Sequence, residues 1–170
     1  MAQFLRPSAH GAAGIGAWTD DAGGTTDIWQ ALDDNTTTEY IEDLNGNNTS
    51  GEFKLSSGTD PAVGTGHVLR FEIQGTGSGG PERCSINLLQ GTGGTVIASI
   101  TNQTSRGAWS GAIAYTLDAV TEADLITDYT DLHITIVSSN LGATEDMWCA
   151  WAELEIPDAP TGSRRIFVVT

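Results

Sequence analysis

Apolar and polar residues alternate with a period of two along much of this chain. In residues 68–73, for example, Leu69, Phe71 and Ile73 are separated by charged side chains. Such alternation is typical of a β-strand that has one face in a core and the other in water. We therefore expect a series of short strands, the most regular being residues 68–73, 83–89, 95–101, 113–117, 132–136 and 147–156.

Weaker strand patterns occupy residues 27–32, 38–42 and 51–55, and the apolar residues 166–169 come near the end of the sequence. Gly, Asn, Asp and Pro separate the strands, which is typical of a β-sandwich of the jelly-roll or immunoglobulin-like kind. One helical turn is expected near residues 121–126, where Thr121 and Asp124 match a capping box. The sequence thus predicts an antiparallel, jelly-roll-like sandwich of the all-β class.

The predicted organisation is an N-terminal arm (residues 1–24), a sandwich domain (25–157) and a C-terminal arm or added strand (158–170). Both ends differ in composition from the middle, the first being rich in Gly and Ala. The apolar residues of the C-terminal arm can either add a strand to their own sheet or pair with another subunit. The candidate partner-binding residues in the two arms are Phe4, Leu5, Arg6, Arg164, Arg165, Ile166, Phe167 and Val168.

Composition agrees with an all-β domain, since 21 of 170 residues are Gly and long Ala/Leu/Glu/Lys stretches are missing. The net charge of −15, from 22 acidic and 7 basic residues, argues against binding to nucleic acid. No apolar stretch approaches the ~20 residues that span a bilayer, so no membrane contact is expected. We expect synthesis in a reducing cytoplasm, with Cys84 inward and Cys149 on the opposite face of its strand, as free thiols rather than a disulfide.

Residues 75–80 spell the dinucleotide-binding pattern, with Gly75, Gly77 and Gly80 in the required places. That site needs a helix after the third glycine, whereas here an alternating strand follows. The segment is therefore predicted to be the tip of a hairpin.

Other candidate catalytic residues are also few. Ser110 lacks the spacing of a nucleophile elbow, and His133 is expected to be solvated or at an interface. We predict no catalytic residue, no metal site and no cofactor.

The five tryptophans are more informative. Alternation along residues 147–156 places Trp148 in the core and Trp151 on the opposite face. Trp18 lies in the expected arm and Trp109 near a loop, so Trp18, Trp109 and Trp151 are candidate exposed aromatic contacts. Exposed rings could stack on sugars or be buried by a partner, and the alternative is that arms and loops of the same chain cover them.

Several motifs together resemble a group of small virion proteins of tailed bacteriophages. They lie at residues 4–7, 16–19, 60–70, 125–132 and 151–157, so the resemblance covers nearly the whole chain. It implies a jelly-roll-like sandwich carried on a phage particle, without a known active site. Some phage sandwiches of this kind are capsid decoration or cement proteins, and others belong to tails or fibres. The group supplies no functional residues to transfer.

The function expected from these observations is that of a non-enzymatic virion protein on the capsid surface, which binds the major capsid protein and stabilises the head. A homo-oligomer is expected, with a trimer as one option. The alternative is a carbohydrate-binding module of a tail or fibre that contacts host surface glycans.

Overall fold

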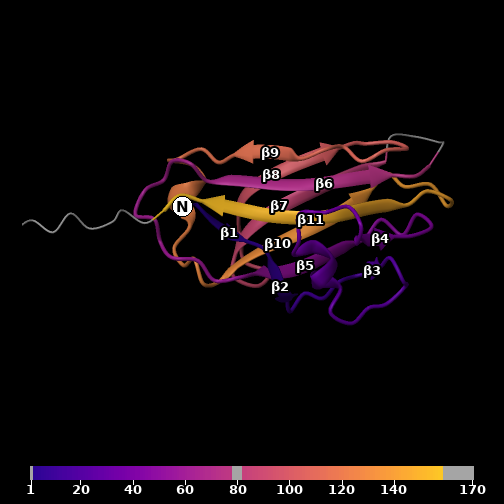
Figure 1. The fold of residues 1–170 in the computed structure, drawn as a ribbon, viewed down its shortest axis with the longest axis horizontal. Coiled ribbons are helices and arrows are strands. Elements are labelled where there is room, and N and C mark those ends of the chain that lie inside the picture. Colours follow the sequence, from indigo (N-terminus) through magenta and orange to yellow (C-terminus); the bar gives the residue numbers. More distant parts are fainter. Residues whose placement is uncertain (1, 78–81, 159–170) are drawn as a thin grey trace, which may run out of the picture.

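The computed structural model describes residues 2–77 and 82–158, which form two β-sheets packed as a sandwich (Figure 1). Sheet A has the strand order β3 (Thr19–Asp20), β4 (Ile41–Asp43), β11 (Met147–Ile156), β6 (Val68–Gly75), β9 (Ile113–Thr116), and β1 (Gln3–Leu5) also pairs with β11. Sheet B has the order β2 (Pro7–His10), β5 (Ser50–Leu55), β10 (Leu132–Ser139), β7 (Arg83–Gln90), β8 (Thr95–Gln103). All pairs of these strands are antiparallel.

From β4 onward the strands pair as nested partners, β4 with β11, β5 with β10, β6 with β9 and β7 with β8. Successive strands therefore alternate between the two sheets, except for β7 and β8, which share sheet B. This is the connectivity of a jelly roll. The predicted fold class is confirmed, and the nesting places β4 beside β11 although they are far apart in sequence.

The core lies between the sheets, where each strand contributes alternate residues. Leu69, Phe71 and Ile73 of β6 are fully buried, as predicted, and so are Ile86 and Leu88 of β7. Each such side chain contributes about 1.5–3 kcal/mol when removed from water. Inward-facing apolar residues thus hold the two layers together.

Both cysteines are free and buried, in agreement with the expected thiols. Burial raises the pKa of Cys84 to about 12, and burial together with the nearby Cys84 raises that of Cys149. A thiolate is disfavoured in an apolar interior, so both groups remain protonated thiols. Cys149 lies in the core, however, and not on the opposite face as predicted.

Two short 3₁₀ helices interrupt the strands. η1 (Ile28–Leu32) replaces the strand expected at residues 27–32, and its N-cap Asp27, with φ 56°, has a left-handed conformation that a β-strand does not accommodate. Ile28 and Leu32 of η1 are buried in the core. Within the described part of the chain, no helix is both long enough and apolar enough to cross a membrane.

η2 (Ala123–Leu125) falls inside the predicted turn at residues 121–126. The expected capping box is not formed, since η2 has Glu122 as its N-cap and no side-chain cap hydrogen bond. The turn before η2 is instead ordered by Asp118. Its Oδ1 accepts hydrogen bonds from the backbone N–H groups of Thr121 at 2.8 Å and Val120 at 3.0 Å. These bonds lower the pKa of Asp118 by stabilising its charged form.

The expected free N-terminal arm is not what the structure shows for residues 3–20. β1 pairs with β11, β2 with β5 and β3 with β4, so this segment adds strands to both sheets. Leu5 is 1% exposed and Trp18 is fully buried. These side chains complete the core, which the Gly- and Ala-rich composition of the segment does not indicate.

The predicted partner contacts of the arms have different outcomes. Arg6 is held within the chain, where its Nε and Nη2 donate hydrogen bonds of 3.0 and 2.9 Å to Glu153 Oε2. Phe4 stays 49% exposed on β1. Outside the described residues lie the remaining candidates, Arg164, Arg165, Ile166, Phe167 and Val168.

The glycine-rich residues 75–80 do not form the predicted hairpin. β6 belongs to sheet A and β7 to sheet B, so the segment joins the two sheets, as the jelly roll requires. The other part of the prediction holds, since β7 begins at Arg83 and a strand follows the glycines. From Glu82 to Gln90 the described chain contains no helix, so the helix N-terminus that a dinucleotide-binding loop requires is not found there.

Candidate functional site

An irregularity in β11 changes which of its side chains leave the core. Between Cys149 and Trp151 the chain advances two residues while β6 advances one, from Ile73 to Glu72. This β-bulge places Trp148 and Trp151 on the same outer face of sheet A, because residues that directly face each other across strands share a face. The prediction that Trp148 is a core residue is therefore wrong.

Three aromatic rings meet on the outer face of sheet A, and we call Tyr40, Trp109 and Trp148 the aromatic patch. Tyr40 and Trp148 are stacked at 25° with their centroids 4.7 Å apart. Trp109 lies 5.8 Å from Tyr40 and 6.2 Å from Trp148. All three side chains are half-buried, so each presents part of its surface to solvent.

The patch is built from segments that are distant in sequence. Tyr40 immediately precedes β4, Trp148 lies in β11, and Trp109 comes from the connection between β8 and β9. Pairing of β4 with β11 brings the first two together, because Glu42 lies directly opposite Trp148. The jelly-roll nesting therefore creates the site.

Trp109 is positioned by backbone bonds between its loop and the end of β6. Gly75 N–H donates to Ser105 O at 2.7 Å, and Gly107 N–H donates back to Gly75 O at 2.9 Å. On the other side of Trp109, Ser110 N–H donates to Ile73 O at 2.9 Å. The loop is thus fixed on both sides of Trp109, which favours a preformed surface.

Trp151 lies on the same outer face but is buried. It is 3% exposed, and its Nε1–H donates a hydrogen bond of 3.0 Å to Glu72 Oε2. The other oxygen of Glu72 accepts from Gly111 N–H at 3.1 Å, two residues after Trp109. Of the three tryptophans predicted to be exposed contacts, Trp18 and Trp151 are buried within the chain, whereas Trp109 belongs to the patch.

Carboxylates surround the patch. The pKa of Glu42 is raised by burial and by the nearby charges of Asp146, Asp21 and Asp20. Burial, Glu42 and Asp21 likewise raise the pKa of Tyr40. A surface of this charge repels anions but offers oxygen acceptors to hydroxyl groups.

Two members of the patch were missed in the sequence. Trp148 was visible, but a bulge cannot be read from alternation, so its face was assigned wrongly. Tyr40 lies in a weak strand pattern at residues 38–42, and nothing local shows that its partner is β11. Strand pairing over such a sequence distance can be seen only in the folded structure.

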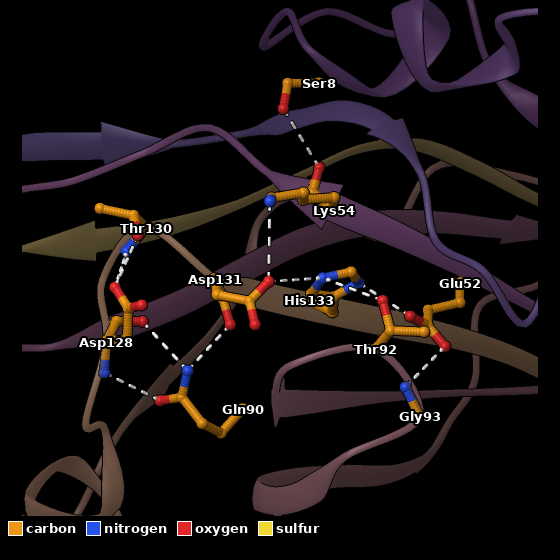
Figure 2. A network of polar contacts seen from close by, with 10 residues as sticks. All are labelled: Ser8, Glu52, Lys54, Gln90, Thr92, Gly93, Asp128, Thr130, Asp131 and His133. Carbon is orange, nitrogen blue, oxygen red and sulfur yellow. Dashed lines mark hydrogen bonds and ion pairs between the residues drawn. The ribbon is translucent and has the colours of Figure 1, made fainter.

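A second polar cluster lies on sheet B (Figure 2). His133 Nδ1 is 2.8 Å from Glu52 Oε1, and His133 Nε2 is 3.3 Å from Asp131 Oδ1. His133 is 2% and Glu52 1% exposed, so the expected solvated or interface histidine is in fact buried. Lys54 Nζ lies 3.6 Å from Asp131 Oδ1, and Gly93 N–H donates to Glu52 Oε2 at 3.2 Å. The cluster fastens the β7–β8 turn to sheet B.

A cavity of about 180 Å³ lies at the opposite end of sheet A from the patch, between the β5–β6 and β9–β10 connections. Its lining includes Asp60, Gly64, Asp124 and Tyr129. The Tyr129 hydroxyl lies 2.8 Å from Nε2 of the buried His67. Burial, Asp60 and Asp124 raise the pKa of Tyr129 to about 12.

In the described residues, no group of three or more His, Cys, Asp or Glu side chains is arranged to hold a metal ion.

The chain was also compared with known proteins. No family model and no curated protein sequence matches the chain.

Solved structures with a similar fold include two carbohydrate-binding modules. TmCBM61, in complex with β-1,4-galactotriose, is 12% identical with a TM-score of 0.44, over 88% of this chain and 86% of that chain. A family 16 carbohydrate-binding module is also 12% identical, with a TM-score of 0.42, over 71% and 78% of the two chains. The enzymatically active domain of bacteriophage CBA120 tailspike protein 4 is 12% identical with a TM-score of 0.45, over 91% of this chain but 19% of that chain. These likenesses concern the jelly-roll sandwich alone.

Proposed function

We propose that this chain is a non-enzymatic carbohydrate-binding module that contacts host surface glycans from a phage tail or fibre. The single observation that carries the proposal is the aromatic patch. Sugar rings have apolar C–H faces that pack on aromatic side chains, and Tyr40, Trp109 and Trp148 offer adjacent ring surfaces for such packing. The phage setting rests on the resemblance of the sequence motifs.

Polar groups beside the rings suit hydroxyl recognition. Glu42 and Gln74 lie directly opposite Trp148 on the neighbouring strands, one on each side. A carboxylate accepts and a carboxamide both donates and accepts, which matches the dual character of sugar hydroxyls. Because Asp146 and Asp21 add negative charge around Glu42, the patch favours neutral glycans over acidic ones.

The capsid-decoration reading has less support from the described residues. It relied on arms free to grip the major capsid protein, whereas Leu5 is buried and Arg6 is bound to Glu153. A homo-oligomer remains part of the proposal, since several weak sugar sites on one particle would act together through multivalency.

The test is a glycan array followed by calorimetry on the wild type and the variants Trp109→Ala and Trp148→Ala. Each variant is expected to weaken binding to a neutral oligosaccharide about tenfold, as loss of about 1.4 kcal/mol would. Phe4→Ala is the matched control, because it removes a half-exposed ring from β1 at the other end of sheet A. Circular dichroism should show that all variants are folded.

Two results would contradict the proposal. One is that both tryptophan variants bind the glycan as tightly as the wild type does. The other is a wild type that binds no glycan but binds purified capsids, which would favour the capsid-decoration alternative.

A further inference from the structure

The cavity between the β5–β6 and β9–β10 connections has an apolar rim. Val63, Val120 and Leu125 are 45%, 74% and 46% exposed, so three aliphatic side chains face solvent in this region. They belong to one surface, because a Cβ on Gly64 would lie 2.8 Å from Ala119 O and 2.6 Å from Asp124 Oδ1. The two connections therefore touch. Val63 lines the cavity, Leu125 lies between the lining residues Asp124 and Ile126, and Val120 follows Ala119.

Inside this rim the cavity is acidic. Asp60 and Asp124 line it together with the ring of Tyr129, on whose hydroxyl both carboxylates act. Two carboxylates beside an aromatic ring favour a cation, and a guanidinium is suited to both kinds of contact. The surface as a whole thus fits a partner with a basic group next to apolar residues.

The chain itself carries such a sequence a few residues beyond its last described position. Arg164 and Arg165 are followed by Ile166, Phe167, Val168 and Val169. The described chain runs to Asp158, and Pro157 lies beside Gly66, where a Cβ would be 3.8 Å from the proline ring. Gly66 is two residues from Gly64 in the cavity wall, so the chain passes the cavity shortly before this segment.

We propose that residues 164–169 dock on this cavity of the same chain, with an arginine between Asp60 and Asp124 and the apolar residues on the Val63, Val120 and Leu125 rim. Six residues lead from Asp158 to Arg164 and span at most about 20 Å, and the cavity wall at Gly64 is only two residues from Gly66, the neighbour of Pro157. A tethered segment also meets its site at a high effective concentration. The docking is independent of glycan binding, because the aromatic patch lies near the other end of β6.

Trypsin provides the test on the full chain, since it cleaves after Arg164 and Arg165 when they are accessible. We compare the wild type with Asp60→Asn/Asp124→Asn at low salt and measure the cleavage rate by mass spectrometry. The double variant is expected to be cleaved about fivefold to tenfold faster, as follows from losing two exposed ion pairs. Raising the salt to about 1 M should bring the wild type towards the variant, because the Debye length falls to about 3 Å.

The matched control is Asp33→Asn/Glu39→Gln, which removes the same charge from two exposed positions outside the cavity. It should be cleaved like the wild type, and all three proteins should unfold at similar urea concentrations. Equal cleavage rates for the wild type and the cavity variant would overturn the proposal. Protection that grows with protein concentration would also overturn it, since the segment would then come from a second copy.

Discussion

Replacement of Leu5 by alanine tests whether the N-terminal residues belong to the sandwich. Leu5 is 1% exposed, and an added Cβ on Gly58 would lie 3.0 Å from Leu5 Cδ1 and 2.9 Å from Ile156 Cδ1. The side chain therefore fills the space between β1, the β5–β6 connection and the end of β11. A buried Leu→Ala change costs about 2–5 kcal/mol, and we expect about 3 kcal/mol for this fully enclosed residue.

The neighbouring residue supplies the control, because Phe4 lies on the same strand but is 49% exposed. Phe4→Ala should cost less than about 1 kcal/mol. Urea unfolding followed by tryptophan fluorescence gives both free energies, and Leu5→Ala should lower the melting temperature by about 6–12 °C in a domain of this size. If the two variants were equally stable, residues 3–10 would not be packed as described, and the prediction of a free arm would return.

Two further predictions concern buried groups. Burial lowers the pKa of His67 below its ordinary 6.5, so the unfolded chain takes up a proton before the native one as the pH falls. The contribution of neutral His67 to the free energy of unfolding should therefore be complete above pH 6.5 and decrease below it, which urea titrations at several pH values would measure. A His67 resonance that titrates at or above pH 6.5 in NMR would show that the sign is wrong. Because both thiols are buried with raised pKa values, Cys84 and Cys149 should react with a thiol reagent at pH 8 only after unfolding. Rapid labelling of the native protein would contradict their place in the core.

The local alternation of apolar and polar residues was sufficient to predict the individual strands in the middle of the chain. β6, β7 and β10 were visible because each has one buried face, and burial imposes a period of two on the sequence. The pairing of strands could not be predicted, because paired strands such as β4 and β11 are separated in sequence by most of the chain. The wrong hairpin at residues 75–80 has this cause: adjacency in sequence was taken for adjacency in a sheet.

The candidate site was only partly predictable for a related reason. Trp109 was among the candidate exposed aromatic residues and lies in the aromatic patch. A single extra residue between Cys149 and Trp151, however, reverses the faces of β11 and moves Trp148 outward. No residue type marks that bulge, since Cys149 and Ala150 are ordinary strand residues. The left-handed Asp27 that precedes η1 is equally invisible in the sequence, so a helical turn was predicted as a strand.

The central position of β11 has a consequence for biosynthesis. β1, β4 and β6 all pair with this last described strand, and Gln3 lies opposite Ile156. While the ribosome is still making the chain, the earlier strands of sheet A have no central partner and expose their hydrogen-bonding edges. Such late, non-local closure slows folding and lengthens the time during which a nascent chain can aggregate. Net negative charge helps to keep these incomplete chains apart until translation passes β11.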